Sequence, residues 1–300
     1  MTQHTLGQSI QALHQGLGEQ GFIADQALAT TIALMSHLER PLLIEGEPGV
    51  GKTAVASALA SYRNTELIRI QCFEGIDASS VLFEWNYAGQ LLAIKLNENQ
   101  QHNLQESDLY QTRYLLERPL LKSIKQPVSP VLLIDEVDRS DEAFEAFLLE
   151  ILSEFSVSIP EIGTIKATSI PLVILTSNGS RELSDALRRR CLYHYADYPD
   201  TEREKRILDT HLPNLNRDLN DQIVRFVQLL REQDLEKRPG IAESLDWAHA
   251  LCAFDLDQLD MQVDLVSNSL SCLIKTKEDQ RFVQEAGLES LLAQSNHTAG

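Results

Sequence analysis

One short stretch of the sequence sets glycines, a lysine and a hydroxyl residue at fixed spacing: residues 46–53 read Gly-Glu-Pro-Gly-Val-Gly-Lys-Thr. Glycines let the backbone curl until several N–H groups face one anion, the lysine adds positive charge, and the threonine hydroxyl is a ligand for Mg²⁺. The pattern G-x-x-x-x-G-K-[ST] therefore predicts a loop that binds the phosphates of a nucleotide. The residues expected to contact the nucleotide here are Gly46, Glu47, Pro48, Gly49, Val50, Gly51, Lys52, Thr53 and Ala54.

Two adjacent carboxylates, Asp135 and Glu136, follow the apolar run Val131–Ile134. Such a run is typical of a strand buried on both faces, and open α/β sheets bind ligands at the carboxyl ends of their strands. Acidic residues also begin many helices, but a preceding phosphate loop favours a catalytic role. We expect Asp135 to hold Mg²⁺ together with Thr53, largely through water, and Glu136 to polarise the water that attacks the γ-phosphate.

Polar residues after later apolar runs are further candidates for the same site. Asn178 is placed to orient the attacking water, although asparagine after a strand is also an ordinary turn residue. Arg188, Arg189 and Arg190 follow each other directly. A triple arginine is usually a solvated basic patch, but the planar fork of arginine suits phosphate, and the rest of the chain is acidic.

The elements that must position these residues are predicted from the apolar pattern. Helical spacing predicts helices at 5–19 and 24–38, ahead of the first strand. Strand, helix, strand order predicts a mostly parallel sheet. Its five strands are expected at residues 41–44, 67–72, 131–134, 170–176 and 191–195. A β-hairpin is predicted within residues 157–167, between two core elements.

From residue 200 onwards the apolar pattern is helical, without a convincing strand. We therefore expect an α/β core at residues 1–199 and a small all-α lid domain at residues 200–300. Arg238 precedes one of the predicted helices. It either closes over the nucleotide or is a solvated loop residue.

The region between the second and third strands contains the aromatic residues Phe73, Phe83, Trp85 and Tyr87. They either project towards a partner or pack against the sheet, and packing is the favoured interpretation. Residues 97–112 are the most polar stretch and predict a solvated loop or flexible insertion. Helical spacing then predicts a helix across residues 114–121.

The composition is that of a soluble globular protein with a strong negative charge. Its 300 residues include 26 Lys and Arg against 44 Asp and Glu, which gives a net charge of −18 and a pI of about 4.8. Such a chain repels nucleic acid and anionic lipid unless a local basic patch overrides the field. We expect no membrane span and no secretory signal, and a cytoplasmic location. Free, mostly buried thiols are expected at Cys72, Cys191, Cys252 and Cys272.

With its phosphate loop, Asp135-Glu136, Asn178 and the three arginines in this order, the chain resembles an AAA+ ATPase with the αβα core of P-loop NTPases. The segment Leu132–Arg139 is similar to the MoxR family within that class. The stretches Gln71-Cys72-Phe73-Glu74-Gly75 and Glu84-Trp85-Asn86-Tyr87 are similar to its CoxD-like branch. The resemblance implies an insertion in the second helix and a hairpin ahead of Asn178.

The resemblance also implies a ring, expected to be a hexamer, with ATP at each subunit junction. One arginine of the neighbouring subunit would act on the γ-phosphate; Arg190 matches the family best and Arg189 is next. Arg238 would serve as the second sensor, although Gly240–Glu243 occupies much of the region where the family carries it. MoxR relatives work with von Willebrand A domain proteins, and CoxD-like members assist the metal-cofactor maturation of a client metalloenzyme.

Our primary hypothesis is an ATP-driven, chaperone-like remodelling ring that acts with a partner adaptor on a client protein. A second hypothesis is a nucleic-acid-associated AAA+ motor or restriction-type subunit, which the acidic composition disfavours. A third is a nucleotide-switched binding module without useful turnover, which the intact Asp135-Glu136 pair disfavours.

Overall fold

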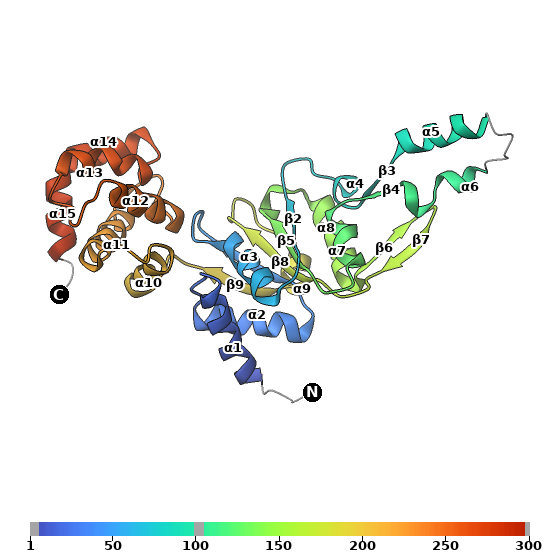
Figure 1. Cartoon of the computed structure of the whole chain (residues 1–300), viewed down its shortest axis with the longest axis horizontal. Helices are drawn as coiled ribbons and strands as arrows, with labels where there is room; N and C mark the ends of the chain where they lie inside the picture. Colours follow the sequence, from blue (N-terminus) through green and yellow to red (C-terminus); the bar gives the residue numbers. More distant parts are fainter. Residues whose placement is uncertain (1–5, 99–104, 298–300) are drawn as a thin grey trace. The chain divides into compact units, whose positions relative to one another are not determined.

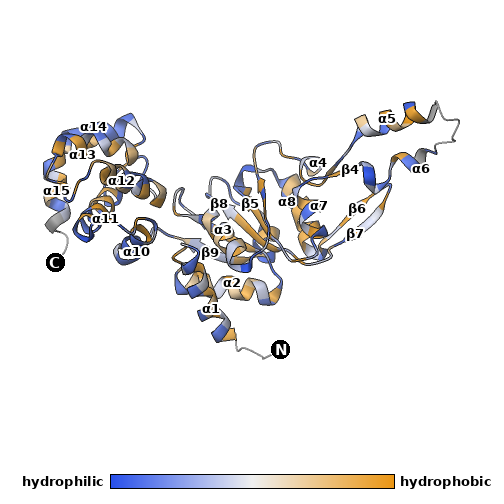
Figure 2. Cartoon of the chain, viewed as in Figure 1, coloured by the Kyte–Doolittle hydropathy of each residue, from blue (hydrophilic) through white to orange (hydrophobic). Residues whose placement is uncertain are grey.

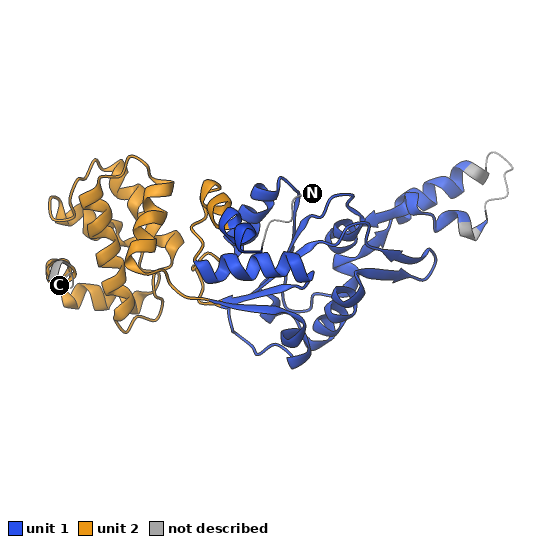
Figure 3. Ribbon diagram, turned by 90° about the horizontal axis from the view of Figure 1, so that it is seen from below, with its two compact units in different colours: residues 1–13, 26–45, 53–195 blue, residues 14–25, 46–52, 196–300 orange. Residues whose placement is uncertain are grey.

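The computed structural model describes residues 6–98 and 105–297 of the chain. Within these ranges the chain divides into two compact units (Figure 3). In the described part, the segments of the first unit are residues 6–13, 26–45, 53–98 and 105–195, and those of the second are residues 14–25, 46–52 and 196–297. Each unit is described below by itself.

The first unit is built on the predicted five-stranded sheet, which the structure confirms. In spatial order its strands are β2 (Leu67–Gln71), β5 (Val131–Asp135), β8 (Leu172–Ser177), β1 (Leu42–Gly46) and β9 (Leu192–Ala196). The pairs β2–β5, β5–β8 and β1–β8 are parallel. Because parallel strands end at the same edge of a sheet, the residues that follow β5 and β8 come together there.

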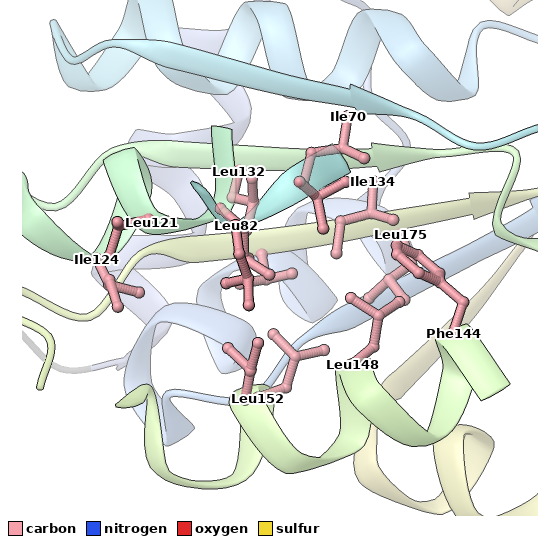
Figure 4. Packing of buried hydrophobic residues seen from close by; sticks show 14 of the residues in the cluster. Ile70, Leu82, Leu121, Ile124, Leu132, Ile134, Phe144, Leu148, Leu152 and Leu175 are labelled. Atoms are coloured by element: carbon pink, nitrogen blue, oxygen red, sulfur yellow. The ribbon is translucent and has the colours of Figure 1, made fainter. Parts of the chain in front are cut away.

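Helices cover the sheet because its central strands are apolar on both faces. Every residue of β5 and β8 is buried, and Figure 2 shows both strands as strongly hydrophobic. On one face, Leu132, Ile134 and Leu175 pack with Phe144 and Leu148 of α8 (Figure 4). The helices that accompany the sheet in sequence are α1 (Leu6–Glu19), α2 (Gln26–Leu38), α3 (Lys52–Arg63), α8 (Glu142–Glu154) and α9 (Asp185–Arg190). The predicted hairpin is present as β6 (Ser156–Ile159) and β7 (Gly163–Lys166), which pair antiparallel.

The segment between β2 and β5 forms its own substructure. Its elements are α4 (Ala78–Val81), β3 (Phe83–Trp85), α5 (Tyr87–Glu98), α6 (Glu106–Leu109), a 3₁₀ turn (Thr112–Tyr114), β4 (Leu115–Glu117) and α7 (Pro119–Lys125). Figure 1 shows α5 and α6 extending away from the five-stranded sheet of this unit. Helices α5 and α6 replace part of the loop predicted for residues 97–112, of which residues 99–104 lie outside the described residues.

The helix predicted across residues 114–121 is only partly present: residues 115–117 form the strand β4, and residues 119–121 are helical as the first turn of α7. Leu115 lies opposite Trp85 in an antiparallel strand pair, and both side chains are buried. Pro119 stands at the start of α7, where its missing N–H is not needed, so it separates strand from helix.

The aromatic residues of this substructure have mixed environments. Trp85 is buried and makes edge-on contacts with Phe83 and Tyr110. Phe73 is 52% exposed and Tyr87 is 61% exposed. Packing is therefore confirmed for Trp85 and wrong for Phe73 and Tyr87.

After β9 the regular elements of the second unit are all helices within its described part, and the first of them begins at Thr201, as predicted. Its elements are α10 (Thr201–His211), α11 (Arg217–Glu232), α12 (Ile241–Ala253), α13 (Val263–Ser269), a 3₁₀ turn (Leu270–Cys272), α14 (Lys277–Ala286) and α15 (Leu288–His297). Phe226 of α11 and Trp247 of α12 are fully buried at the centre of its core, with ring centroids 5.3 Å apart. Within the described ranges, none of the helices combines the length and the apolar character that crossing a bilayer requires.

Candidate nucleotide-binding site

The glycine-rich loop, in the second unit, is wrapped around its own lysine. The Lys52 side chain is buried, and its Nζ donates to the carbonyl oxygens of Gly46 at 2.7 Å and Glu47 at 2.8 Å. Gly49 has a φ of 81°, a conformation that glycine adopts without strain. The chain thus has the curled backbone and central ammonium group that suit a bound phosphate.

The first turn of α12 packs directly on this loop, within the same unit. The Ile241 N–H donates to the Gly49 carbonyl oxygen at 2.9 Å, and the Glu243 carboxylate accepts from the Gly240 N–H at 3.1 Å. A Cβ atom on Gly240 would lie only 2.7 Å from the Gly49 Cα. Arg238, just ahead of this turn, is exposed and makes no hydrogen bond or ion pair with the described part of the chain. The loop contact at the start of α12 is therefore made by glycine backbone and not by Arg238.

The first unit brings together the two residues predicted to hold Mg²⁺. The Thr53 hydroxyl lies 3.2 Å from a carboxylate oxygen of Asp135, whose side chain is buried. Thr176, at the end of β8, donates to the same oxygen at 2.5 Å. These hard oxygen atoms fit Mg²⁺, which takes one or two carboxylates and completes its shell with water and phosphate oxygens. The described ranges contain no group of three or more His, Cys, Asp or Glu arranged for an all-protein metal cage.

Arg69, on β2, is an additional partner of Asp135 that sequence reasoning missed. Its Nη2 lies 2.5 Å from the second carboxylate oxygen of Asp135 and 2.7 Å from the Gln71 side-chain oxygen. The sheet register pairs Gln71 with Asp135, and Arg69 lies two residues earlier on the same face of β2. The sequence predicts a parallel sheet but neither the pairing of β2 with β5 nor its register, so it carries no signal for this contact.

Glu136 is held in an unusual backbone conformation beside Asn178. Its φ of 54° and ψ of 50° are in the left-handed region, which is uncommon for residues other than glycine. The Glu136 N–H donates to the Thr176 hydroxyl at 2.9 Å, and its carboxylate accepts from Gln71 at 3.0 Å. The Asn178 amide reaches the same carboxylate at 3.5 Å, and Arg139 at 3.3 Å. Backbone strain of this kind concentrates at functional sites, where the surrounding contacts fix it.

Asp138, which the sequence reasoning did not single out, anchors the loop that carries Asn178. It accepts the Asn178 N–H at 3.2 Å, the Ser180 N–H at 3.0 Å and the Ser180 hydroxyl at 2.6 Å. Burial acts to raise the pKa of Asp138, but these hydrogen bonds outweigh it and leave the pKa below its usual value. Asp138 is therefore an ionised anchor for Asn178.

The three consecutive arginines have different surroundings. Arg188 forms an ion pair with Glu45 at 2.5 Å. Arg190 donates to the carbonyl oxygens of Leu152 and Ser153, at 3.1 and 2.8 Å. The exposed Arg189 side chain makes no hydrogen bond or ion pair with the described residues. No bond links any of the three to Asp135 or Glu136 within that same part of the chain.

The cysteines are free, as predicted, but only Cys72 and Cys191 are buried, while Cys252 and Cys272 are half-buried. Burial raises the pKa of Cys72 to about 12, and the nearby carboxylates of Asp135, Asp138 and Glu136 act in the same direction. Burial likewise raises the pKa of Cys191 to about 12. Both groups are neutral thiols at physiological pH and lack the thiolate that nucleophilic chemistry requires.

Comparison with known proteins identifies the class of this site. The family model described as an AAA domain of the dynein-related subfamily matches residues 41–191, which include the glycine-rich loop, Glu136 and Asn178. The chain belongs to this AAA family. It is accordingly an ATPase of the AAA class.

Two similar proteins that are named ATPases agree with the ATPase assignment. The chain is 26% identical over 270 residues to the gas vesicle ATPase GvpN of Haloferax mediterranei, covering 84% of this chain and 76% of the relative. It is 25% identical over 288 residues to GvpN2 of Halobacterium salinarum, covering 91% and 81%. Among solved structures, a RuvB variant of Thermotoga maritima superposes with a TM-score of 0.50 at 19% identity, covering 95% of this chain and 85% of the other. The AAA chain thus has the predicted P-loop NTPase α/β fold with a helical C-terminal region.

Proposed function

We propose that this AAA protein couples ATP hydrolysis to chaperone-like remodelling or maturation of a client protein. The observation that supports the hydrolysis is the convergence of Thr53, Asp135, Glu136 and Asn178 near the carboxyl ends of β5 and β8, and the family resemblance supports the action on a client. Residues 1–199 would form the ATPase core and residues 200–300 the lid.

Each residue has a role that its surroundings support. The loop from Gly46 to Lys52 would bind the nucleotide phosphates, while Thr53 and Asp135 would hold Mg²⁺. A magnesium ion held by these two residues would supply positive charge that offsets the negative charge of the phosphates. Glu136 would orient the attacking water and accept its proton, and Asn178, anchored by Asp138, would fix that water.

A neighbouring subunit would complete the site with an arginine. The resemblance favours Arg190, but its guanidinium is occupied by two carbonyl oxygens of α8 in its own chain. Arg189 is exposed and without a side-chain partner in the described part, so its surroundings favour Arg189 as the residue that acts in trans. Removing an arginine of this kind costs about 10³–10⁵ in hydrolysis rate.

The assembly and partners follow from the family resemblance. We propose a cytoplasmic ring, expected to be a hexamer, of the MoxR type and CoxD-like branch. It would act with a von Willebrand A domain protein, and its client would be a metalloenzyme that receives its metal cofactor. The similarity to proteins named gas vesicle ATPases supports the ATPase part of this proposal.

Steady-state ATP hydrolysis by Glu136→Gln tests the catalytic assignment. We expect a loss of at least about 10²-fold, because the amide cannot accept a proton. Nucleotide binding should persist, since the loop residues are unchanged. Hydrolysis at the unsubstituted rate would exclude Glu136 as the base, and loss of binding as well would show that the substitution disturbs the fold.

A further inference from the structure

The buried carboxylate of Asp135 carries a positive partner from its own chain. The Arg69 guanidinium lies 2.5 Å from one Asp135 oxygen, while Thr53 and Thr176 both contact the other oxygen. Asp135 is thus surrounded by two hydroxyl groups and one arginine. The arginine supplies the charge that a buried carboxylate requires.

We propose that Arg69 competes with Mg²⁺ for Asp135, so that the metal can load only when the arginine swings away. The inference rests on the proposed function, since it concerns the same ATP site. It assigns Arg69 a role in setting how strongly the site depends on the metal.

The two side chains differ in exposure, so Asp135 must stay where it is while Arg69 can move away from it. The Asp135 side chain is 5% exposed, so it needs a cation beside it in every state. The Arg69 side chain is 52% exposed and stands on β2, an edge strand, so its guanidinium can return to water at little cost. A dication at the Thr53 and Asp135 oxygens would also repel a guanidinium this close.

The competition predicts a specific change in metal dependence. The quantity to measure is the affinity for a non-hydrolysable ATP analogue with Mg²⁺, divided by the affinity in EDTA, both by calorimetry. Arg69→Gln keeps hydrogen-bonding groups but removes the charge, so the ratio should rise about three- to tenfold. Arg69→Lys keeps the charge and should leave the ratio near that of the unsubstituted protein.

Two further variants test whether the change in the ratio comes from the particular side chain introduced or from the net charge of the chain. Arg69→Met, a second neutral substitution that keeps an apolar stem, should raise the ratio like Arg69→Gln. Arg118 is a matched control, since it is 47% exposed and pairs with Glu84 on the surface of the same unit. Arg118→Gln removes the same charge from the chain and should leave the ratio unchanged.

The outcomes separate this inference from the proposed function. A ratio that is unchanged or lower in both neutral variants would overturn the competition while leaving the ATPase assignment intact. A ratio that rises equally in Arg118→Gln would assign the effect to net charge and also overturn it. Failure of the unsubstituted protein to bind the analogue under any condition would contradict the proposed function and, with it, the role of Arg69.

Discussion

At the scale of single residues, Asp138 ties the end of β5 to the loop that carries Asn178. Its carboxylate accepts three hydrogen bonds from Asn178 and Ser180, and the side chain is almost fully buried. Asp138→Asn replaces one acceptor oxygen by a donor that faces other donors. We expect a loss of about 1–3 kcal/mol in the free energy of unfolding at neutral pH.

The pH dependence of this loss follows from the lowered pKa of Asp138. Because the pKa of Asp138 is lower in the folded protein, its ionisation stabilises the fold fully at pH values above the pKa of an unfolded aspartate, about 3.9. That stabilisation is lost as the pH falls through the lower folded value. Urea unfolding of both proteins should therefore give a difference that is constant from pH 7 to about pH 5 and shrinks in more acidic solution. A difference independent of pH down to acid unfolding would mean that packing, and not charge, accounts for it.

At the scale of elements, the glycine contact between the phosphate loop and α12 leaves no room for a side chain. Gly240→Ala would place a methyl group 2.7 Å from the Gly49 Cα and 2.8 Å from the Gly49 carbonyl oxygen. We expect about 1–3 kcal/mol of destabilisation from this overpacking. Nucleotide affinity should fall too, because the loop backbone must shift.

Gly18→Ala is the matched control in the same unit. Gly18 lies in α1, and a Cβ there meets nothing within 4 Å, so this variant should be neutral or up to about 1 kcal/mol more stable. Thermal unfolding and calorimetric titration with ATP measure both effects. Unchanged ATP affinity in Gly240→Ala would show that the loop does not depend on its contact with α12.

The sheet was predictable because each central strand is a short, continuous apolar run. The strand β4 could not be predicted in the same way, because the apolar residues at 114–121 fit the spacing of a helix equally well. The strand forms because Leu115 pairs with Trp85, which lies 30 residues earlier in the chain, and this tertiary contact is not visible in the local sequence. The same limit applies to Tyr87, whose exposure depends on where α5 points.

The residues of the candidate site likewise fall into those that the sequence predicted and those that it did not. Thr53, Asp135, Glu136 and Asn178 were predicted because their motifs are local in sequence, and the structure brings them together; their catalytic roles stay predictions. The partners Arg69, Gln71 and Thr176 depend on strand register and on the reach of individual side chains, which spacing does not encode. The left-handed backbone of Glu136 also has no signature in residue type.

At the scale of the whole molecule, if an arginine of one subunit acts in the site of its neighbour, two variants that are inactive alone should regain ATP hydrolysis when they are mixed. Arg189→Ala lacks the arginine offered to its neighbour, and Glu136→Gln lacks the base in its own site. In a mixed ring, an Arg189→Ala subunit beside a Glu136→Gln subunit has a complete site. Equal mixing should restore ATP hydrolysis at about a quarter of the sites.

The measurement compares ATP hydrolysis of the mixture with that of each variant alone, after exchange of subunits. A mixture no more active than the mean of its components would contradict an Arg189 that acts across subunits. Arg190→Ala is the informative control, since loss of its two carbonyl partners should lower the melting temperature. Complementation by Arg190→Ala instead of Arg189→Ala would reassign the trans role.

Because the backbone of Glu136 is strained, a substitution that increases the thermal stability of the protein at this position also removes its activity. Glycine at this position would relieve a left-handed conformation that costs about 1 kcal/mol or more, while removing the proposed base. A library selected only for survival on heating should therefore enrich glycine at position 136 and accumulate inactive protein. Thermostable variants of this ATPase will have to be selected for turnover and stability together.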